Sequence, residues 1–273
     1  MLGLKVTASL HWGFWSRAPS TSKVQPSLPV FPPTTLLGAL AADLARRTAL
    51  RFDDLTVGGE FWHKNGQLFS LASLLDEAVV ASAYFKDGTM GFPYQDINKY
   101  VTLHYHQTVL TDGIPRRYHY KFRMGAVPVG KIVASKGLVS ICYLLDEQKC
   151  MKLLHDDWKR NITLAAFNIE RLGSKESIVS VESVDLITPI KLQDKAIRTC
   201  LYFPVRSVEE NSVEGEFYTE TFWKGGWLMG GSPQFEEYII PGRRLPVRSG
   251  IVSARLKSGE AYEFGPEEIL IVP

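Results

Sequence analysis

The sequence contains few cysteines and carries little net charge. Cys142, Cys150 and Cys200 are its three cysteines, and they form no C-x-x-C pair. An odd count without such a pair argues against a disulfide framework and against a cysteine zinc site, and it fits a protein of the reducing cytoplasm. The formal net charge is +2. Any nucleic-acid-binding surface must therefore come from cations that cluster locally.

Long hydrophobic runs are also missing. No apolar stretch approaches the roughly 18 residues that a membrane-spanning helix needs. The first ten residues alternate in polarity and lack the basic segment followed by an apolar run that marks a signal peptide. The sequence therefore predicts neither secretion nor a membrane partner. Its 45% hydrophobic and 22% charged residues are typical of a folded globular chain.

Common catalytic signatures are absent. There is no G-x-S-x-G elbow, no H-E-x-x-H helix and no zinc-deaminase signature. The glycine-rich stretch 223–232 matches neither a P-loop nor a dinucleotide fingerprint, and we interpret it as a tight turn flanked by packing tryptophans. His104 and His106 have strand spacing, but no carboxylate or cysteine accompanies them. We expect no cofactor and no metal site.

Hydrophobic periodicity predicts an α+β core in the first two thirds of the chain. We expect strands at 2–11, 78–85, 137–145 and 178–186, and helices at 35–49, from 146 towards 158, and at 161–172. Thr34 is the expected N-cap of the first helix, and Gly173 is placed to end the last one. The order strand, helix, strand, strand, helix, strand is that of a ferredoxin-like, RRM-type βαββαβ core.

The pattern of apolar segments changes after residue 188. Short apolar segments separated by glycine and proline predict strands at 199–204, 216–224, 238–240, 251–256 and 269–272. We therefore expect two domains. Residues 1–188 form the ferredoxin-like domain, and residues 189–273 form a small, mostly β C-terminal domain.

A segment at about 86–136 is inserted between the second and third predicted strands, and it is locally basic. Among its cations are Lys99, Arg116, Arg117, Lys121, Arg123, Lys131 and Lys136. Tyrosines and a phenylalanine alternate with these charges. A basic groove with stacking rings is what single-stranded RNA requires, so the insertion is a candidate RNA-binding element.

Asp112-Gly113 inside this insertion is a strong signal for a two-residue hairpin turn. With the turn centred there, the facing pairs are Thr111 and Ile114, His106 and His119, Tyr105 and Tyr120, His104 and Lys121, and Thr102 and Arg123. One face of the hairpin becomes cationic and rich in imidazole. We interpret it as a thumb that lies along an RNA backbone; the alternative is a solvated hairpin that binds only a protein neighbour.

The same segment raises a catalytic hypothesis. His104, His119, Tyr120 and Lys121 are side-chain types that can activate a ribose 2′-hydroxyl and protonate a leaving oxygen without a metal. The loop from Arg171 to Glu176 offers a second binding element. Gly173 would let backbone amides approach a phosphate, and Arg171 and Lys175 would neutralise it, although the glycine also fits an ordinary helix stop.

Three stretches resemble the CRISPR-associated Cas-five family. They are Trp15-Ser-Arg17, the segment Pro29 to Leu40 (PVFPPTTLLGAL), and the segment Arg171 to Val179 (RLGSKESIV). The resemblance implies a ferredoxin-like RNA-recognition domain with a hairpin thumb, seated on the five-prime handle of the guide RNA (crRNA) in a Cascade complex. It implies the backbone subunit and the large subunit as partners, with target DNA reached only through the assembled complex. In its general character the sequence resembles those of the archaeal type I-A branch.

The resemblance also implies the residues that bind the handle. They are Arg17 and Lys23 in the first loop, Thr34 and Thr35 at the helix start, and Arg171, Gly173, Ser174 and Lys175. The amides of Thr35 and Leu36 would meet a phosphate. One branch of the family cuts repeat RNA with a Tyr, His and Lys set, but no such triad aligns here. Our leading hypothesis is a non-catalytic RNA-binding subunit; the alternatives are a metal-independent endoribonuclease and a protein-only scaffold.

Overall fold

The computed structural model describes residues 1–18, 26–47, 56–58, 61–64, 67–70, 75–76, 78–101, 124–224 and 234–273. These residues form a mixed α/β protein made mostly of strands, with the helices α1 (Pro33–Arg47), α5 (Glu147–Leu154) and α6 (Trp158–Phe167). None of the described helices has the length and apolar character needed to cross a bilayer.

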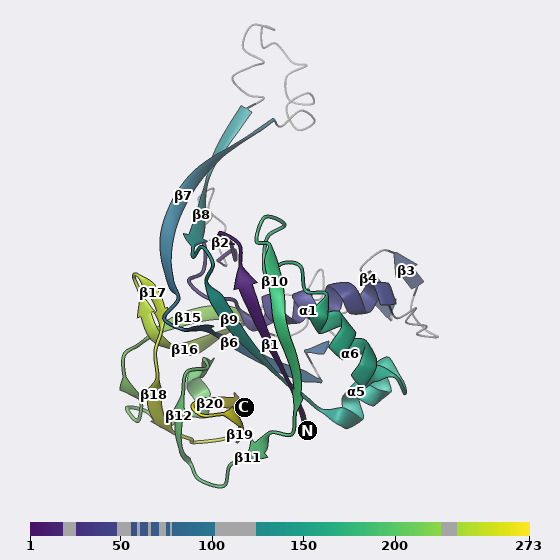
Figure 1. The fold of residues 1–273 in the computed structure, drawn as a ribbon, viewed down its shortest axis with the longest axis vertical. Helices are drawn as coiled ribbons and strands as arrows, with labels where there is room; N and C mark the ends of the chain where they lie inside the picture. The colour runs from purple at the N-terminus through teal and green to yellow at the C-terminus, as the bar shows by residue number, and fades with distance from the viewer. Residues whose placement is uncertain are drawn as a thin grey trace, which may run out of the picture.

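An antiparallel four-stranded sheet forms the centre of the molecule, in the order β10-β1-β9-β6 (Figure 1). Its strands are β1 (Leu2–Leu10), β6 (Val79–Lys86), β9 (Leu138–Leu145) and β10 (Val179–Ile187). All four were predicted from the sequence to within one residue at each end. The apolar residues of β1 recur at every second position, as expected for a strand with one buried face, whereas β9 is apolar and buried on both faces.

The capping of α5 follows the sequence, but other helix boundaries do not. Asp146 caps α5 as predicted, and its Oδ1 accepts the amides of Gln148 and Lys149 at 3.1 Å each. The helix α1, however, begins at Pro33, whose fixed φ and missing N–H suit the first helical position. Thr34 therefore lies inside the first turn, and its predicted role as N-cap is wrong.

The last predicted helix also ends earlier than the sequence indicated. The helix α6 stops at Phe167, with Asn168 as its C-cap. Gly173 lies beyond this end, so its predicted role as the helix stop is wrong. Gly173 instead lies in the loop after the helix, where its backbone closely approaches the backbone of Trp15.

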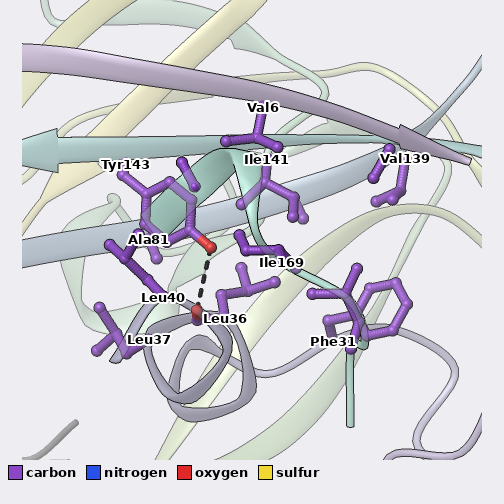
Figure 2. Close-up of a cluster of buried hydrophobic side chains, with 14 of the residues drawn as sticks. Val6, Phe31, Leu36, Leu37, Leu40, Ala81, Val139, Ile141, Tyr143 and Ile169 are labelled. Atoms are coloured by element: carbon purple, nitrogen blue, oxygen red, sulfur yellow. Dashed lines mark hydrogen bonds between the residues drawn. The ribbon is translucent and has the colours of Figure 1, made fainter. Parts of the chain in front are cut away.

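Two buried tyrosines attach the start of α1 to the rest of the core. In Figure 2, Tyr143 points from β9 towards α1, and its hydroxyl donates to the carbonyl of Leu36 at 3.0 Å. Tyr202 donates in the same way to the carbonyl of Phe31 at 2.9 Å. Both hydroxyls are buried and need a partner there, so the segment that leads into α1 has a defined position over the sheet.

The opposite face of the central sheet is covered by strands from the end of the chain. Cys142 and Leu144 of β9 belong to a buried cluster with Tyr262, Phe264 and Leu270. Beside it, the carboxylate of Glu268 accepts the ammonium of Lys5 at 2.5 Å and the hydroxyl of Tyr84 at 2.6 Å. RRM proteins stack bases on this face of their sheet. Here the chain itself occupies the part that carries these residues.

A long antiparallel hairpin projects from the body of the molecule (Figure 1). It consists of β7 (Met90–Val101) and β8 (Met124–Val133), and it lies between β6 and β9 as the sequence predicted. Its register runs one for one from Phe92 opposite Val133 to Val101 opposite Met124. This is the register that a turn at Asp112-Gly113 requires, although the predicted pairs themselves lie outside the described residues.

Residues after 188 form further short strands. They are β11 (Ile190–Lys191), β12 (Ala196–Thr199), β13 (Phe203–Pro204), β14 (Glu214–Gly215), β15 (Phe217–Lys224), β16 (Gln234–Arg244), β17 (Val247–Ser249), β18 (Val252–Arg255), β19 (Glu260–Gly265) and β20 (Glu268–Val272), with a 3-10 turn at Val205–Ser207. The predicted strand 199–204 is wrong, because residues 200–202 separate β12 from β13. Sequence patterns also missed β19.

The C-terminal strands do not stand apart from the hairpin. Val247 of β17 pairs with Gly91 of β7, so one seven-stranded sheet contains the base of the hairpin and strands from the end of the chain. The short strand β2 (Gly13–Phe14) joins the same sheet through β8. Strands β3 (Thr56–Gly58), β4 (Phe61–Lys64) and β5 (Gln67–Ser70) form a separate small sheet. The domain boundary at residue 188 stays a prediction.

Replacing Tyr143 with phenylalanine should destabilise the protein by about 1 kcal/mol, because the variant loses the buried hydrogen bond to Leu36. Urea denaturation followed by circular dichroism measures the change. Tyr94→Phe is the matched control, since the Tyr94 side chain is 57% exposed. Equal stabilities of the two variants would contradict this role for Tyr143.

Candidate nucleic-acid interface

Two loops that are far apart in the sequence lie side by side next to the start of α1. We name them the N-terminal loop (residues 11–17) and the glycine loop (residues 171–178). The amide of Ser174 donates to the carbonyl of Trp15 at 3.1 Å, and the amide of Trp15 donates to Ser177 Oγ at 3.0 Å. The indole of Trp12 donates to the carbonyl of Glu176 at 2.7 Å. These bonds hold the two loops together.

Gly173 allows this close approach of the two backbones. Its φ is +96°, and a Cβ atom at this position would lie 2.6 Å from the carbonyl oxygen of Trp15. A side chain would therefore suffer both an unfavourable backbone conformation and a direct clash with the backbone of Trp15. The glycine is needed for the contact between the loops.

A cavity of about 510 Å³ opens where the two loops meet the start of α1. Its aromatic lining comes from Trp15, Phe222 and Trp223, and β15 contributes the last two. Its hydroxyl lining comes from Ser16, Thr34, Thr35 and Ser174. Apolar rings with a few convergent polar groups are typical of a ligand site, and the volume is ordinary for one.

The cations near this cavity carry uncompensated charge. Arg17, Arg171 and Lys175 are exposed, and none of them forms an ion pair with a described residue. In the C-terminal strands the arginines are engaged instead: Arg243 and Arg248 pair with Glu216. Free positive charge therefore gathers around the two loops, although the whole chain is close to neutral.

The first turn of α1 offers less to an anion than the sequence predicted. The amides of Thr35 and Leu36 both donate to the carbonyl of Pro32, at 2.9 and 3.2 Å. The prediction that these two amides meet a phosphate is therefore wrong. The Thr34 amide makes no hydrogen bond within the described residues and remains the first-turn donor. Thr35 Oγ1 lies 3.4 Å from Ser16 Oγ, so its hydroxyl faces the N-terminal loop.

Lys131 differs from the other predicted RNA contacts. Its ammonium lies 3.1 Å from Asp96 Oδ2 and 3.1 Å from Glu176 Oε2, and its side chain is 16% exposed. Partial burial disfavours the charged ammonium, but hydrogen bonds and ion pairs with these carboxylates outweigh it and raise the pKa of Lys131. Conversely, the hydrogen bond from Lys131 lowers the pKa of Asp96.

Known proteins resemble the chain over its full length. CRISPR-associated protein Cas5 3 and CRISPR system aCascade subunit Cas5 1, both of Saccharolobus solfataricus, are 27% and 26% identical to it over 272 residues, which cover 99% of this chain and 99% of each relative. The chain is thus similar over its full length to proteins of the Cas5 family. This is the Cas-five family that the sequence motifs resemble.

A solved structure agrees at the level of the fold. The crystal structure of a CRISPR protein from Archaeoglobus fulgidus superimposes with a TM-score of 0.60 at 20% identity, covering 99% of both chains. No protein-family model matches the chain.

The residues of the Cas5 motifs come together in space. Arg17, Thr34, Thr35, Gly173 and Ser174 line the cavity, while Arg171 and Lys175 belong to the glycine loop beside it. Lys99 lies in β7, where its side chain is not described. The remaining candidates, Lys23, His104, Arg116, Arg117, His119, Tyr120, Lys121 and Arg123, lie outside the described residues.

Sequence reasoning missed the aromatic wall of the cavity. Trp223 was assigned to a packing turn, and Phe222 was given no role, yet both line the cavity together with the Cas5 motif residues. The available signal was their place at the end of a strand next to a glycine-rich stretch. Within the described residues, no cluster of three or more His, Cys, Asp or Glu side chains is arranged for a metal.

Gly173→Ala should destabilise the protein by about 1 to 3 kcal/mol, because the methyl group meets the Trp15 carbonyl and φ is positive. Gly38→Ala is the matched control: no atom lies within 4 Å of a Cβ built there, and alanine in a helix should stabilise by about 0.5 to 1 kcal/mol. Urea denaturation of both variants measures the difference. Equal effects would refute the close-approach account.

Proposed function

We propose that this Cas5-family chain is a non-catalytic subunit of a CRISPR type I interference (Cascade) complex that binds and caps the five-prime handle of the crRNA. The observation that carries the proposal is the cluster of Arg17, Arg171 and Lys175, none of which forms an ion pair with a described residue, beside a cavity lined by Cas5 motif residues. A free cation holds a phosphate, and a cavity with aromatic walls accepts an unstacked base.

In this proposal the cations bind the RNA phosphates, and the cavity recognises a base by its shape. Arg17, Arg171 and Lys175 contact the phosphate backbone, and the Thr34 amide adds a donor at the helix start. A base inserted into the cavity stacks against tryptophan and is read by hydroxyl and backbone groups. Specificity for the handle then comes from single-stranded bases and affinity from phosphates, as is usual for RNA recognition.

The fold class and the thumb belong to the same proposal. The order of β1, α1, β6, β9, α6 and β10 supports a ferredoxin-like βαββαβ core. We propose that the hairpin β7–β8 is the thumb and that its segment 102–123 lies along the RNA with its cationic face. The register of the hairpin stem supports this arrangement, because it is the one expected for a turn at Asp112-Gly113, which predicts that His104 faces Lys121 and Thr102 faces Arg123.

The partners are proposed from the relatives. One is named as an aCascade subunit, which supports assembly into an archaeal complex, and the type I-A branch is our proposal for the subtype. The neighbours would be the backbone subunit and the large subunit in the cytoplasm, with target DNA bound only by the assembled complex. The C-terminal strands, whose arginines are ion-paired, suit protein packing better than phosphate binding.

One incubation separates the proposed function from its alternatives. Purified chain is mixed with end-labelled CRISPR repeat RNA in EDTA, and one sample is divided between a native and a denaturing gel. We expect a shifted, intact RNA. Cleavage at one site that His104→Ala or His119→Ala abolishes would establish the metal-independent endoribonuclease instead. Absence of any RNA shift, with binding to the other subunits retained, would support the protein-only scaffold.

Alanine at Arg171 or Lys175 should weaken handle binding and reduce the slope of log Kd against log salt by about 0.7 for each lost phosphate contact. Lys121→Ala and Arg123→Ala in the thumb should do the same. Arg243→Ala is the matched control, since Arg243 is paired with Glu216 and does not line the cavity. An unchanged slope in the loop variants would remove these residues from the interface.

A further inference from the structure

We propose that Lys131 is a positioning residue that joins the hairpin to the glycine loop, rather than the phosphate contact its charge suggests. The proposal rests on the proposed function, because it concerns how the two RNA-binding elements are held relative to each other. It assigns a role to a cation that sequence reasoning counted among the RNA contacts.

Lys131 stands where three separate segments meet. Its backbone is in β8, opposite Tyr94 of β7. Its ammonium contacts Asp96 of β7 and Glu176 of the glycine loop at 3.1 Å each. One side chain therefore connects the stem of the hairpin to the loop that carries Arg171 and Lys175.

Trp12 completes the junction from the N-terminal loop. The ammonium of Lys131 lies 5.6 Å from the centre of the Trp12 ring, within reach of a cation–π attraction. The indole N–H of Trp12 donates to the backbone carbonyl of Glu176 at 2.7 Å. Both the side chain and the backbone of Glu176 are thus held by groups that belong to other segments.

The local charge is wrong for a phosphate. Two carboxylates face a single ammonium, so the junction of Lys131, Asp96 and Glu176 carries a net negative charge. The lysine side chain is 16% exposed, whereas the two carboxylates are 40% and 48% exposed. An approaching phosphate would meet the carboxylates first and would have to displace one of them to reach the ammonium.

A junction at this position controls the geometry of the whole interface. The strands β7 and β8 extend away from the body of the molecule (Figure 1), so a small rotation at their base moves their far ends by a large distance. RNA that contacts both the hairpin and the cavity requires one relative orientation of the two. Without the junction, only the strand pairings at the base of the hairpin, β7 with β17 and β8 with β2, still hold it. The remaining freedom of the stem relative to the glycine loop must then be lost on binding, and this ordering lowers affinity.

Handle-RNA binding by Lys131→Met and Glu176→Gln tests the proposal, with Kd measured over a series of salt concentrations. Both variants should bind about fivefold more weakly, in line with the loss of partly exposed ion pairs, and both should keep the wild-type salt slope. Weaker binding of Glu176→Gln is the sharper result. Removing a negative charge near RNA would otherwise strengthen binding.

Lys131→Arg is the conservative control and should restore the wild-type Kd, because a guanidinium can bridge the same two carboxylates. The double variant Lys131→Met/Glu176→Gln should bind no more weakly than either single variant, since both remove the same junction. Circular dichroism and urea denaturation verify that the variants are folded.

A salt slope that falls by about 0.7 in Lys131→Met, together with tighter binding by Glu176→Gln, would make Lys131 a phosphate contact and overturn the inference. Failure of the wild-type chain to bind handle RNA is a separate result, because it would refute the proposed function itself.

Discussion

The close contact between Gly173 and the backbone of Trp15 is the constraint on which the candidate interface depends. It brings the glycine loop against the N-terminal loop, and the hydrogen bonds from Ser174 to Trp15 and from Trp15 to Ser177 then fix their register. The cavity forms between these loops and the start of α1. Any side chain at position 173 would push the loops apart and open the arrangement that gathers the free cations.

Two further features of the fold define the surroundings of this contact: the hydrogen bonds that hold the start of α1, and the C-terminal strands that cover the opposite face of the central sheet. Buried hydroxyls of Tyr143 and Tyr202 hold the segment that enters α1, so the third wall of the cavity has a defined place. The C-terminal strands cover the opposite face of the central sheet through Tyr262 and Phe264. The part of that face around Cys142 and Leu144 is therefore occupied by the chain itself, which agrees with the proposal that RNA binds at the two loops instead.

The sequence pattern predicted the central strands. It could not predict the helix ends or the roles of Gly173 and Lys131, because these depend on contacts between residues that are far apart in the sequence. The central strands were predictable because β1 alternates in polarity, and because β6 and β9 are short apolar runs that contain β-branched or aromatic residues. Helix ends were less so: the N-cap rule favoured Thr34, while Pro33 already satisfied the first turn. The role of Gly173 depends on the carbonyl of Trp15, and that of Lys131 on Asp96 and Glu176, which the sequence does not show to be neighbours. Lys131 was predicted to contact RNA because it is a cation of the basic insertion.

Photo-crosslinking of handle RNA to the whole chain is the most direct test of where RNA binds. RNA carrying 4-thiouridine at successive handle positions is irradiated in complex with the protein, and the crosslinked peptides are identified by mass spectrometry. The account predicts crosslinks in residues 12–18, in residues 171–178 and around Trp223. Crosslinks confined to β18–β20, with none in the two loops, would contradict it.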